Sequence, residues 1–355
     1  MSEHDDGATR REFLQQAAAV GATLAIAGGS ALGREDPLPL IDPGGGRIPR
    51  KPLGTTGQNL SILGIGGYSL GQAPSYDEAE RIVHEAVDAG VDFFDNAWEY
   101  NEHRSEEWMG RALAGRRDRA FLMTKVCTHG RGKDVAMQQL GESLRRLKTD
   151  HLDLWQIHEV VYWNDPELIF RDGGAIEALV EAKKQGKTRF IGFTGHKHPE
   201  IHLRVLELAD KRGLHFDTVQ LPLNAFDATF RSFEQQVLPA LRRHGAGALG
   251  MKSLGGNGQP IRQGVLRVDE ALRYAMSLPV ATTVSGIDSL AVLRQNLGVA
   301  RAFKPMSATE MQALRQRCAA VAGDGHLELY KTTMRYDADV GRAEHGLPSP
   351  KDLPL

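Results

Sequence analysis

Val91-Asp-Phe-Phe-Asp-Asn-Ala-Trp-Glu-Tyr100 joins an apolar run to a carboxylate and, five residues later, to a phenol. The apolar run suits a buried strand, so Asp95 and Tyr100 fall where a loop towards a helix begins. Two later apolar runs also end in ionisable groups, Lys125 and His158. A closed barrel of parallel strands gathers such groups around one mouth. We therefore expect these four side chains to share one pocket.

The four groups together suit acid–base chemistry. A phenol is a poor acid at neutral pH because its ordinary pKa is about 10, and a nearby ammonium lowers that pKa by favouring phenolate. Asp95 would keep Lys125 charged and in place, and His158 would donate a hydrogen bond to a substrate oxygen. A salt bridge or a capping role explains any one of these residues equally well. The prediction therefore depends on the order and placement of all four.

These residues resemble the aldo-keto reductase family, whose tetrad is Asp, Tyr, Lys and His in that order. Asp95 to Tyr100 is similar to the family's D-T-A-x-x-Y, and residues 105–113 are similar to its following S-E-x-x-x-G-x-A-L helix. The likeness runs from about Leu53 to about Ala302. It implies an NAD(P)-dependent enzyme that transfers hydride between nicotinamide and a carbonyl or alcohol carbon of a small molecule or sugar. Tyr100 would be its general acid or base.

Length and periodicity indicate an α/β fold. A chain of 355 residues with 41% hydrophobic content holds a (β/α)8 TIM barrel of about 250 residues as one domain. An open doubly wound sheet is the alternative, which is disfavoured because no G-x-G-x-x-G follows the first strand. A β-hairpin is expected at residues 53–60, before the first strand, and a helix at residues 307–321 follows the last strand–helix unit. The expected strands are residues 62–68, 91–95, 121–126, 152–158, 190–194, 218–222, 248–253 and 281–286, and the expected helices are residues 76–89, 105–113, 135–147, 174–185, 200–211, 233–243, 268–276 and 289–302.

The N-terminus resembles a twin-arginine (Tat) export signal. Thr9-Arg-Arg-Glu-Phe-Leu14 precedes an Ala-rich apolar run that is too short for a membrane span. We expect a signal at residues 1–31, a Gly/Pro-rich linker at 32–49, the barrel at 50–304, and a C-terminal helix and tail over the barrel at 305–355. The Tat machinery would export the protein to the periplasm or the cell exterior, with the signal removed or kept as an anchor. A cytosolic leader is the alternative.

Composition disfavours several other classes of protein. A net charge of −2 with mixed signs gives no basic surface for nucleic acid. Cys127 and Cys318 are too few for a disulfide scaffold or an all-cysteine zinc site. His196 and His198 lack a third ligand at a telling spacing, so we predict no metal.

The resemblance implies a dinucleotide site along the ends of the other strands. Thr194 and Gln220 would hold the nicotinamide amide, and Met251 stands where a ring usually stacks on nicotinamide. The glycines before Tyr68 would let the backbone approach a ligand. The expected cofactor contacts are Gly66, Gly67, Tyr68, Asp95, Thr194, Gln220, Met251, Lys252, Ser253, Leu254, Gly255, Ser285, Gly286, Asp288, Arg294 and Asn296.

Asp288 bears on the choice between NADP and NAD. It aligns with the Lys or Arg that commonly binds the adenosine 2′-phosphate in the family. A carboxylate repels that phosphate and accepts from ribose hydroxyls instead, which favours NAD slightly. Arg294 is the alternative phosphate partner, and Asp288 is alternatively the N-cap of the helix at residues 289–302.

Export raises a further question, because free nicotinamide cofactor is not expected to be recycled outside the cytoplasm. One hypothesis is a tightly held cofactor that serves a redox-neutral cycle on a sugar. A regulatory barrel that binds nucleotide without catalysis is another, and a Schiff-base lyase using Lys125 is a third.

Overall fold

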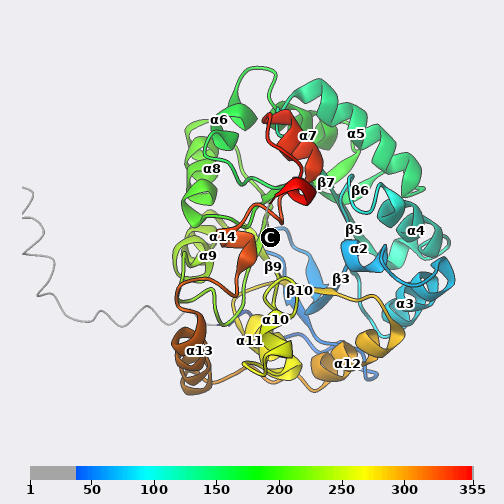
Figure 1. The fold of residues 1–355 in the computed structure, drawn as a ribbon. Coiled ribbons are helices and arrows are strands. Elements are labelled where there is room, and N and C mark those ends of the chain that lie inside the picture. The colour runs from blue at the N-terminus through cyan, green and yellow to red at the C-terminus, as the bar shows by residue number, and fades with distance from the viewer. Residues whose placement is uncertain (1–36, 354–355) are drawn as a thin grey trace, which may run out of the picture. The chain divides into compact units, whose positions relative to one another are not determined.

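The computed structural model describes residues 37–353. Eight parallel strands close into a barrel in the order β10-β3-β4-β5-β6-β7-β8-β9, with helices around the outside (Figure 1). This confirms the predicted (β/α)8 barrel and excludes the open doubly wound sheet. The predicted signal at residues 1–31 lies outside the described residues. The barrel strands are β3 Leu63–Gly66, β4 Phe93–Asp95, β5 Phe121–Val126, β6 Leu152–Ile157, β7 Thr188–Thr194, β8 Thr218–Pro222, β9 Gly247–Met251 and β10 Thr282–Gly286.

The main helices follow the predicted alternation to within a few residues, and several short helices lie in the loops. Ordinary helix signals mark some of their starts: the side chain of Ser75 caps α3, and that of Ser289 caps α12. The helices are α2 Gly67–Leu70, α3 Tyr76–Asp88, α4 Arg104–Ala112, α5 Lys133–Arg146, α6 Asp165–Phe170, α7 Ala175–Lys184, α8 Pro199–Lys211, α9 Phe233–His244, α10 Gln259–Arg262, α11 Val268–Ser277, α12 Leu290–Arg301, α13 Ala308–Ala322, α14 Leu329–Thr332 and α15 Asp339–Glu344, with 3-10 turns at Arg117–Arg119 and Pro350–Asp352.

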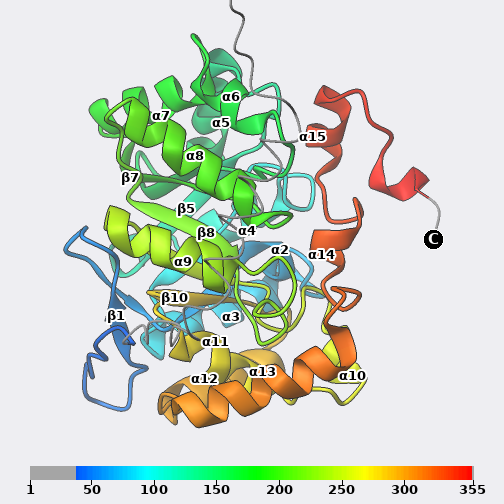
Figure 2. The same ribbon diagram turned by 90° about the vertical axis from the view of Figure 1, so that its left-hand side faces the viewer.

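An N-terminal hairpin closes one end of the barrel. Strands β1 (Arg50–Pro52) and β2 (Asn59–Ser61) pair antiparallel, and the buried Leu53 and Leu60 join the barrel's inner apolar core. Figure 2 shows β1 at the end of the barrel opposite α14 and α15. The predicted hairpin is confirmed, and the opposite end of the barrel is left for a site.

Two apolar cores hold the barrel. A large one lies between the strands and the outer helices, and a small one fills the barrel interior near the hairpin. The strands are therefore buried on both faces, as expected for a parallel sheet covered by helices. Among residues 37–353, no helix is both long and apolar enough to cross a membrane.

The segment after α13 is joined to the barrel by buried charges. Lys331 of α14 pairs with Asp227 at 2.6 Å and with Glu328 at 2.9 Å, and all three side chains are fully buried. Farther along, Asp337 pairs with Lys197 at 2.6 Å. In α15, Glu344 accepts a hydrogen bond from the hydroxyl of Thr128 at 2.9 Å. These contacts fix residues 327–345 across the end of the barrel opposite the hairpin.

Candidate active site

The period of two along a strand explains why the predicted tetrad converges. Phe93, Phe121 and Leu154 all belong to the inner core. Side chains an even number of residues away point the same way. Asp95 lies two residues beyond Phe93, and Lys125 four beyond Phe121. By the same rule His158 lies four residues beyond Leu154. The ionisable side chains therefore lie above the inner apolar core, nearer the C-terminal ends of the strands.

The structure brings the four predicted residues together. The Lys125 ammonium donates to Asp95 Oδ1 at 2.5 Å, to the Asn96 carbonyl at 2.8 Å and to the Tyr100 hydroxyl at 3.3 Å. His158 Nε2 lies 3.5 Å from that hydroxyl. Lys125 and Asp95 are 1% and 4% exposed, so their attraction is little screened by water. The phenol oxygen therefore lies between an ammonium and an imidazole.

The pKa of Tyr100 differs from our expectation. Burial raises it well above its ordinary value, and the nearby charges of Asp95, Glu99 and Glu159 raise it further. The expectation that Lys125 lowers this pKa was wrong for the protein without ligands. The ammonium lies closer to Asp95 than to the phenol, so the two charges largely offset each other at Tyr100. Tyr100 consequently keeps its proton at neutral pH.

A cavity of about 730 Å³ opens above these groups. Its floor includes Tyr100 and His158, and one wall comes from the C-terminal segment. Aromatic and charged side chains dominate the lining. The lining includes Tyr68, Trp98, Glu99, Glu102, Glu159, Thr194, Met251, Lys252, Tyr336 and Asp339.

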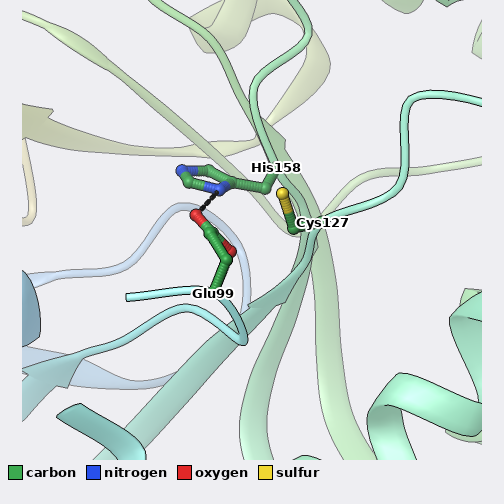
Figure 3. Close-up of side chains that lie close together, drawn as sticks. All are labelled: Glu99, Cys127 and His158. Carbon is green, nitrogen blue, oxygen red and sulfur yellow. Dashed lines mark ion pairs between the residues drawn. The ribbon is translucent and has the colours of Figure 1, made fainter. Parts of the chain in front are cut away.

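A carboxylate, a thiol and an imidazole meet beside the tetrad (Figure 3). Glu99 Oε1 lies 2.6 Å from His158 Nδ1, which is an ion-pair distance, although the two atoms do not meet the angular criteria of a hydrogen bond. Cys127 completes the group and is fully buried. Burial raises the pKa of its thiol well above the ordinary value, and the charges of Glu99 and Glu159 add to this.

Glu159 connects the site to the C-terminal segment. Its carboxylate lies 3.6 Å from His129 Nε2 and 3.3 Å from His196 Nε2, and it accepts from the Ala338 backbone N–H at 2.7 Å. Burial alone would raise the pKa of Glu159, but hydrogen bonds from both histidines outweigh it and hold the pKa well below its ordinary range. The backbone of Glu159 has φ 50°, which is strained for a residue with a side chain.

Several predicted cofactor residues face the cavity or its floor. Thr194, Met251, Lys252 and Tyr68 line it. Gln220 donates to Asp95 Oδ1 at 3.3 Å, while its own carbonyl oxygen is buried and has no hydrogen-bond partner among residues 37–353.

Lys252 is a distinctive member of this group. Its ammonium lies 5.3 Å and 5.2 Å from the ring centroids of Tyr330 and Tyr336. Burial lowers its pKa to about 8. In the same loop Ser253 is buried, Leu254 packs against the outer core, and Gly255 has φ +77°, a conformation that glycine adopts without strain.

The remaining predicted cofactor residues lie near β10 and α12. Asn296 donates to Ser285 Oγ at 3.0 Å, and its amide oxygen is buried without a hydrogen-bond partner in the described part of the chain. Gly286 and Asp288 are exposed. Arg294 is held by a two-point salt bridge to Glu85, at 2.8 and 2.9 Å.

One of our interpretations requires correction. The alternative role of Asp288 as N-cap is wrong, because Ser289 accepts from the Val292 N–H and caps α12. Gly67 is required by protein packing, since a Cβ there would lie 2.5 Å from the Asp95 carbonyl oxygen. Gly66 is packed similarly, because a Cβ added there would lie 3.0 Å from the Ser285 carbonyl oxygen.

Sequence reasoning assigned no role to Glu99 and Glu159. Each directly adjoins a predicted site residue, Glu99 before Tyr100 and Glu159 after His158. A second acid beside a predicted catalytic group is a usable signal. A tail over the barrel was expected, but individual residues of the C-terminal wall such as Tyr336 gave no signal, because contacts far away in the sequence place them at the mouth.

The fold and the site define a barrel with an acid–base group at the base of a cavity sized for a small molecule. The sequence model of the aldo/keto reductase family matches residues 62–259. The chain therefore belongs to this family of oxidoreductases.

Individual relatives are distant. The L-galactose dehydrogenase of Arabidopsis thaliana is 32% identical over 159 residues, which span 42% of this chain and only 49% of that protein. The holo form of aldo-keto reductase AKR11C1 from Bacillus halodurans matches with a TM-score of 0.64 at 24% identity, covering 76% of this chain and 96% of that one. An aldo/keto reductase from Klebsiella pneumoniae, solved with NADP and acetate, matches with a TM-score of 0.60 at 22% identity, covering 73% and 91%. These two structures support the fold alone.

Proposed function

We propose that the protein is an NAD(P)-dependent oxidoreductase that interconverts a carbonyl and an alcohol, with Tyr100 as general acid or base. The observation that carries the proposal is the position of the Tyr100 hydroxyl, between Lys125 Nζ at 3.3 Å and His158 Nε2 at 3.5 Å, on a cavity floor. Only a group that faces both the substrate oxygen and a source of charge compensation can exchange a proton there.

The residues present fit a nicotinamide dinucleotide, which when bound supplies or accepts the hydride. The unpartnered amide oxygen of Gln220 suits the nicotinamide carboxamide, and Thr194 offers a hydroxyl beside it. Met251 offers an apolar cover for the ring. The unpartnered amide oxygen of Asn296 suits an amino or hydroxyl donor of the adenosine part. A buried polar atom without a partner is costly, so bound cofactor would relieve both.

In carbonyl reduction, Tyr100 gives its proton to the substrate oxygen. Its raised pKa keeps that proton in place until the oxygen becomes basic. Lys125 then stabilises the phenolate, and Asp95 holds Lys125 in position. His158 orients the substrate oxygen, so the protein supplies placement and proton transfer.

We favour a polyhydroxylated substrate such as a sugar or sugar aldehyde. Tyr68, Trp98 and Tyr336 give the cavity flat faces that stack on sugar rings, and Glu102 and Asp339 supply acceptors for hydroxyl groups. The similarity to a sugar dehydrogenase is consistent with this choice.

NAD is favoured over NADP as the cofactor. Asp288 is exposed where a 2′-phosphate would meet a negative charge, and Arg294 is already paired with Glu85. The NADP bound by the Klebsiella pneumoniae protein belongs to a chain only 22% identical to this one. The ratio of NAD to NADP affinities in titrations of the purified protein decides between them.

We further propose Tat-dependent export with the cofactor already bound, serving a redox-neutral cycle on one sugar carbon. The paired arginines and Ala-rich run at the N-terminus support export, and the tetrad in the same chain supports catalysis after export. Denatured protein should release one nucleotide per chain. Purified protein without nucleotide, with micromolar or weaker rebinding, refutes a prosthetic cofactor.

Tyr100→Phe tests the central proposal, with Tyr336→Phe as a matched loss of a phenol from the same cavity. Tyr100→Phe should keep dinucleotide affinity and lose about 10²- to 10⁴-fold in kcat on test aldehydes. Tyr336→Phe should keep most of its turnover. Reduction by Tyr100→Phe at the wild-type rate refutes the acid role.

Two other functions predict different results. Absence of turnover on any carbonyl would favour a regulatory barrel, and a borohydride-trapped adduct on Lys125 would favour a lyase.

A further inference from the structure

Glu99 and the proposed acid, Tyr100, contact different ring nitrogens of His158. Its Oε1 is 2.6 Å from Nδ1, and the other ring nitrogen, Nε2, is 3.5 Å from the Tyr100 hydroxyl. The imidazole therefore lies between a carboxylate and a phenol. Because Glu99 directly precedes Tyr100, one short loop positions both ends of this row. Figure 3 shows the carboxylate of Glu99 facing the imidazole of His158.

The burial of Glu99 makes His158 its natural partner. Both oxygens of Glu99 and Nδ1 of His158 are buried, and none has a hydrogen bond of good geometry within residues 37–353. A buried carboxylate is costly unless a donor or a positive charge faces it. In the described part of the chain, the ion-pair contact of Glu99 is with His158.

The residue types also suit a zinc ion, because Glu99, Cys127 and His158 offer ligand atoms within 4.8 Å of one another. The direct contact of 2.6 Å argues against this reading. Two ligands each about 2.1 Å from a tetrahedral ion would lie about 3.4 Å apart. The closed contact between carboxylate and imidazole therefore fits a proton held between them better than an ion.

We propose that Glu99 is a positioning residue that holds a proton on His158 Nδ1, so that Nε2 exchanges protons with Tyr100. This inference rests on the proposed function. After the phenol proton moves to the substrate oxygen, the phenolate takes a proton from Nε2 of imidazolium His158. The ring is then neutral, with its remaining proton on Nδ1 facing Glu99, and water in the cavity returns a proton to Nε2. Alcohol oxidation runs through the same transfers in reverse. Such a carboxylate–imidazole pair fixes the tautomer of the ring.

Glu99→Gln in the full chain tests the role of the carboxylate, and Glu107→Gln is the matched control because it removes an exposed carboxylate of α4 that does not line the cavity. We expect Glu99→Gln to lower kcat for aldehyde reduction about 10- to 100-fold while KM and dinucleotide affinity stay near wild type. The solvent deuterium isotope effect on kcat should rise because proton transfer becomes rate-limiting. Glu107→Gln should change neither kcat nor the isotope effect.

A second measurement needs no turnover. Long-range proton–nitrogen spectra of 15N-histidine protein without cofactor, with His158 assigned from the peaks lost in His158→Asn, should show a proton on Nδ1. Glu99→Gln should change the ring nitrogen shifts of His158. A wild-type ring with its only proton on Nε2 overturns the proposal, even if Glu99→Gln does not fold.

Two further results would also overturn it. Unchanged kcat in Glu99→Gln, with Tyr100→Phe inactive, removes the role of Glu99 and leaves the proposed function standing. Stoichiometric Zn²⁺ binding by calorimetry that is lost in Cys127→Ser identifies a metal site instead. Full turnover by Tyr100→Phe is a different failure, because it refutes the proposed function itself.

Discussion

For variants of the Lys125–Asp95 ion pair we predict different effects on stability and on catalysis. The pair is almost fully buried, with its charged atoms 2.5 Å apart. Lys125→Met leaves the Asp95 carboxylate buried with one remaining side-chain donor, Gln220 at 3.3 Å. Asp95→Asn leaves the ammonium with the Asn96 carbonyl and a phenol. Each single variant therefore contains an uncompensated buried charge.

Removal of one partner of a buried pair costs about 3–5 kcal/mol in unfolding free energy. The double variant buries neither charge, so its loss should be smaller than the sum of the single losses by about 2–3 kcal/mol. Catalysis should not recover in the same way, since the phenolate of Tyr100 still lacks its ammonium. We expect the double variant to be more stable than Lys125→Met but equally inactive.

The assay is urea unfolding of the four proteins, followed by tryptophan fluorescence, beside aldehyde reduction at saturating cofactor. Losses of stability that add within about 0.5 kcal/mol would show that the two charges are not coupled. A double variant that regains turnover would show that Lys125 acts on structure alone. Either result refutes our reasoning about this pair.

Three other predictions concern the surroundings of the tetrad. The pKa of Glu159 in the folded protein lies well below its ordinary value, so this carboxylate stabilises the fold above its unfolded pKa, and the contribution is lost as pH falls towards the folded pKa. Glu159→Gln should therefore lower Tm at pH 7 but much less near pH 3. Calorimetry at both pH values tests this, and an equal loss of Tm at both would contradict it. Gln220→Leu should weaken dinucleotide binding about 3- to 10-fold in fluorescence titrations, through the loss of one buried hydrogen bond, and unchanged affinity would remove the residue from the site. Asp288→Asn should raise NADP affinity relative to NAD about fivefold, since an exposed charge pair contributes about 1 kcal/mol; an unchanged ratio would place the 2′-phosphate elsewhere.

The barrel and the convergence of the tetrad were predictable because they depend on local patterns. Strict alternation after Phe93 and Phe121 fixes the direction in which Asp95 and Lys125 point, and eight strand–helix repeats fix the closure. Neither inference needs a contact between distant segments.

The features that could not be predicted depend on several electrostatic effects acting together or on contacts between segments far apart in the sequence. The raised pKa of Tyr100 reflects burial together with several carboxylates around it, and their distances are set only by the folded loops. Tyr336 reaches the cavity because nearby anchors such as Asp337 with Lys197 pin its segment to the barrel. Ser289 rather than Asp288 caps α12, since one residue of register decides which oxygen faces the helix.

The late position of residues 335–351 in the chain has a consequence for biosynthesis. The last barrel strand ends at Gly286, so the barrel can close during translation while one side of the cavity is still missing. If the protein binds a dinucleotide as proposed, this interval lets the dinucleotide reach the cavity before Tyr336 and Asp339 complete its lining. A nucleotide bound in this way would be retained because the segment that completes the cavity wall is translated after the barrel strands.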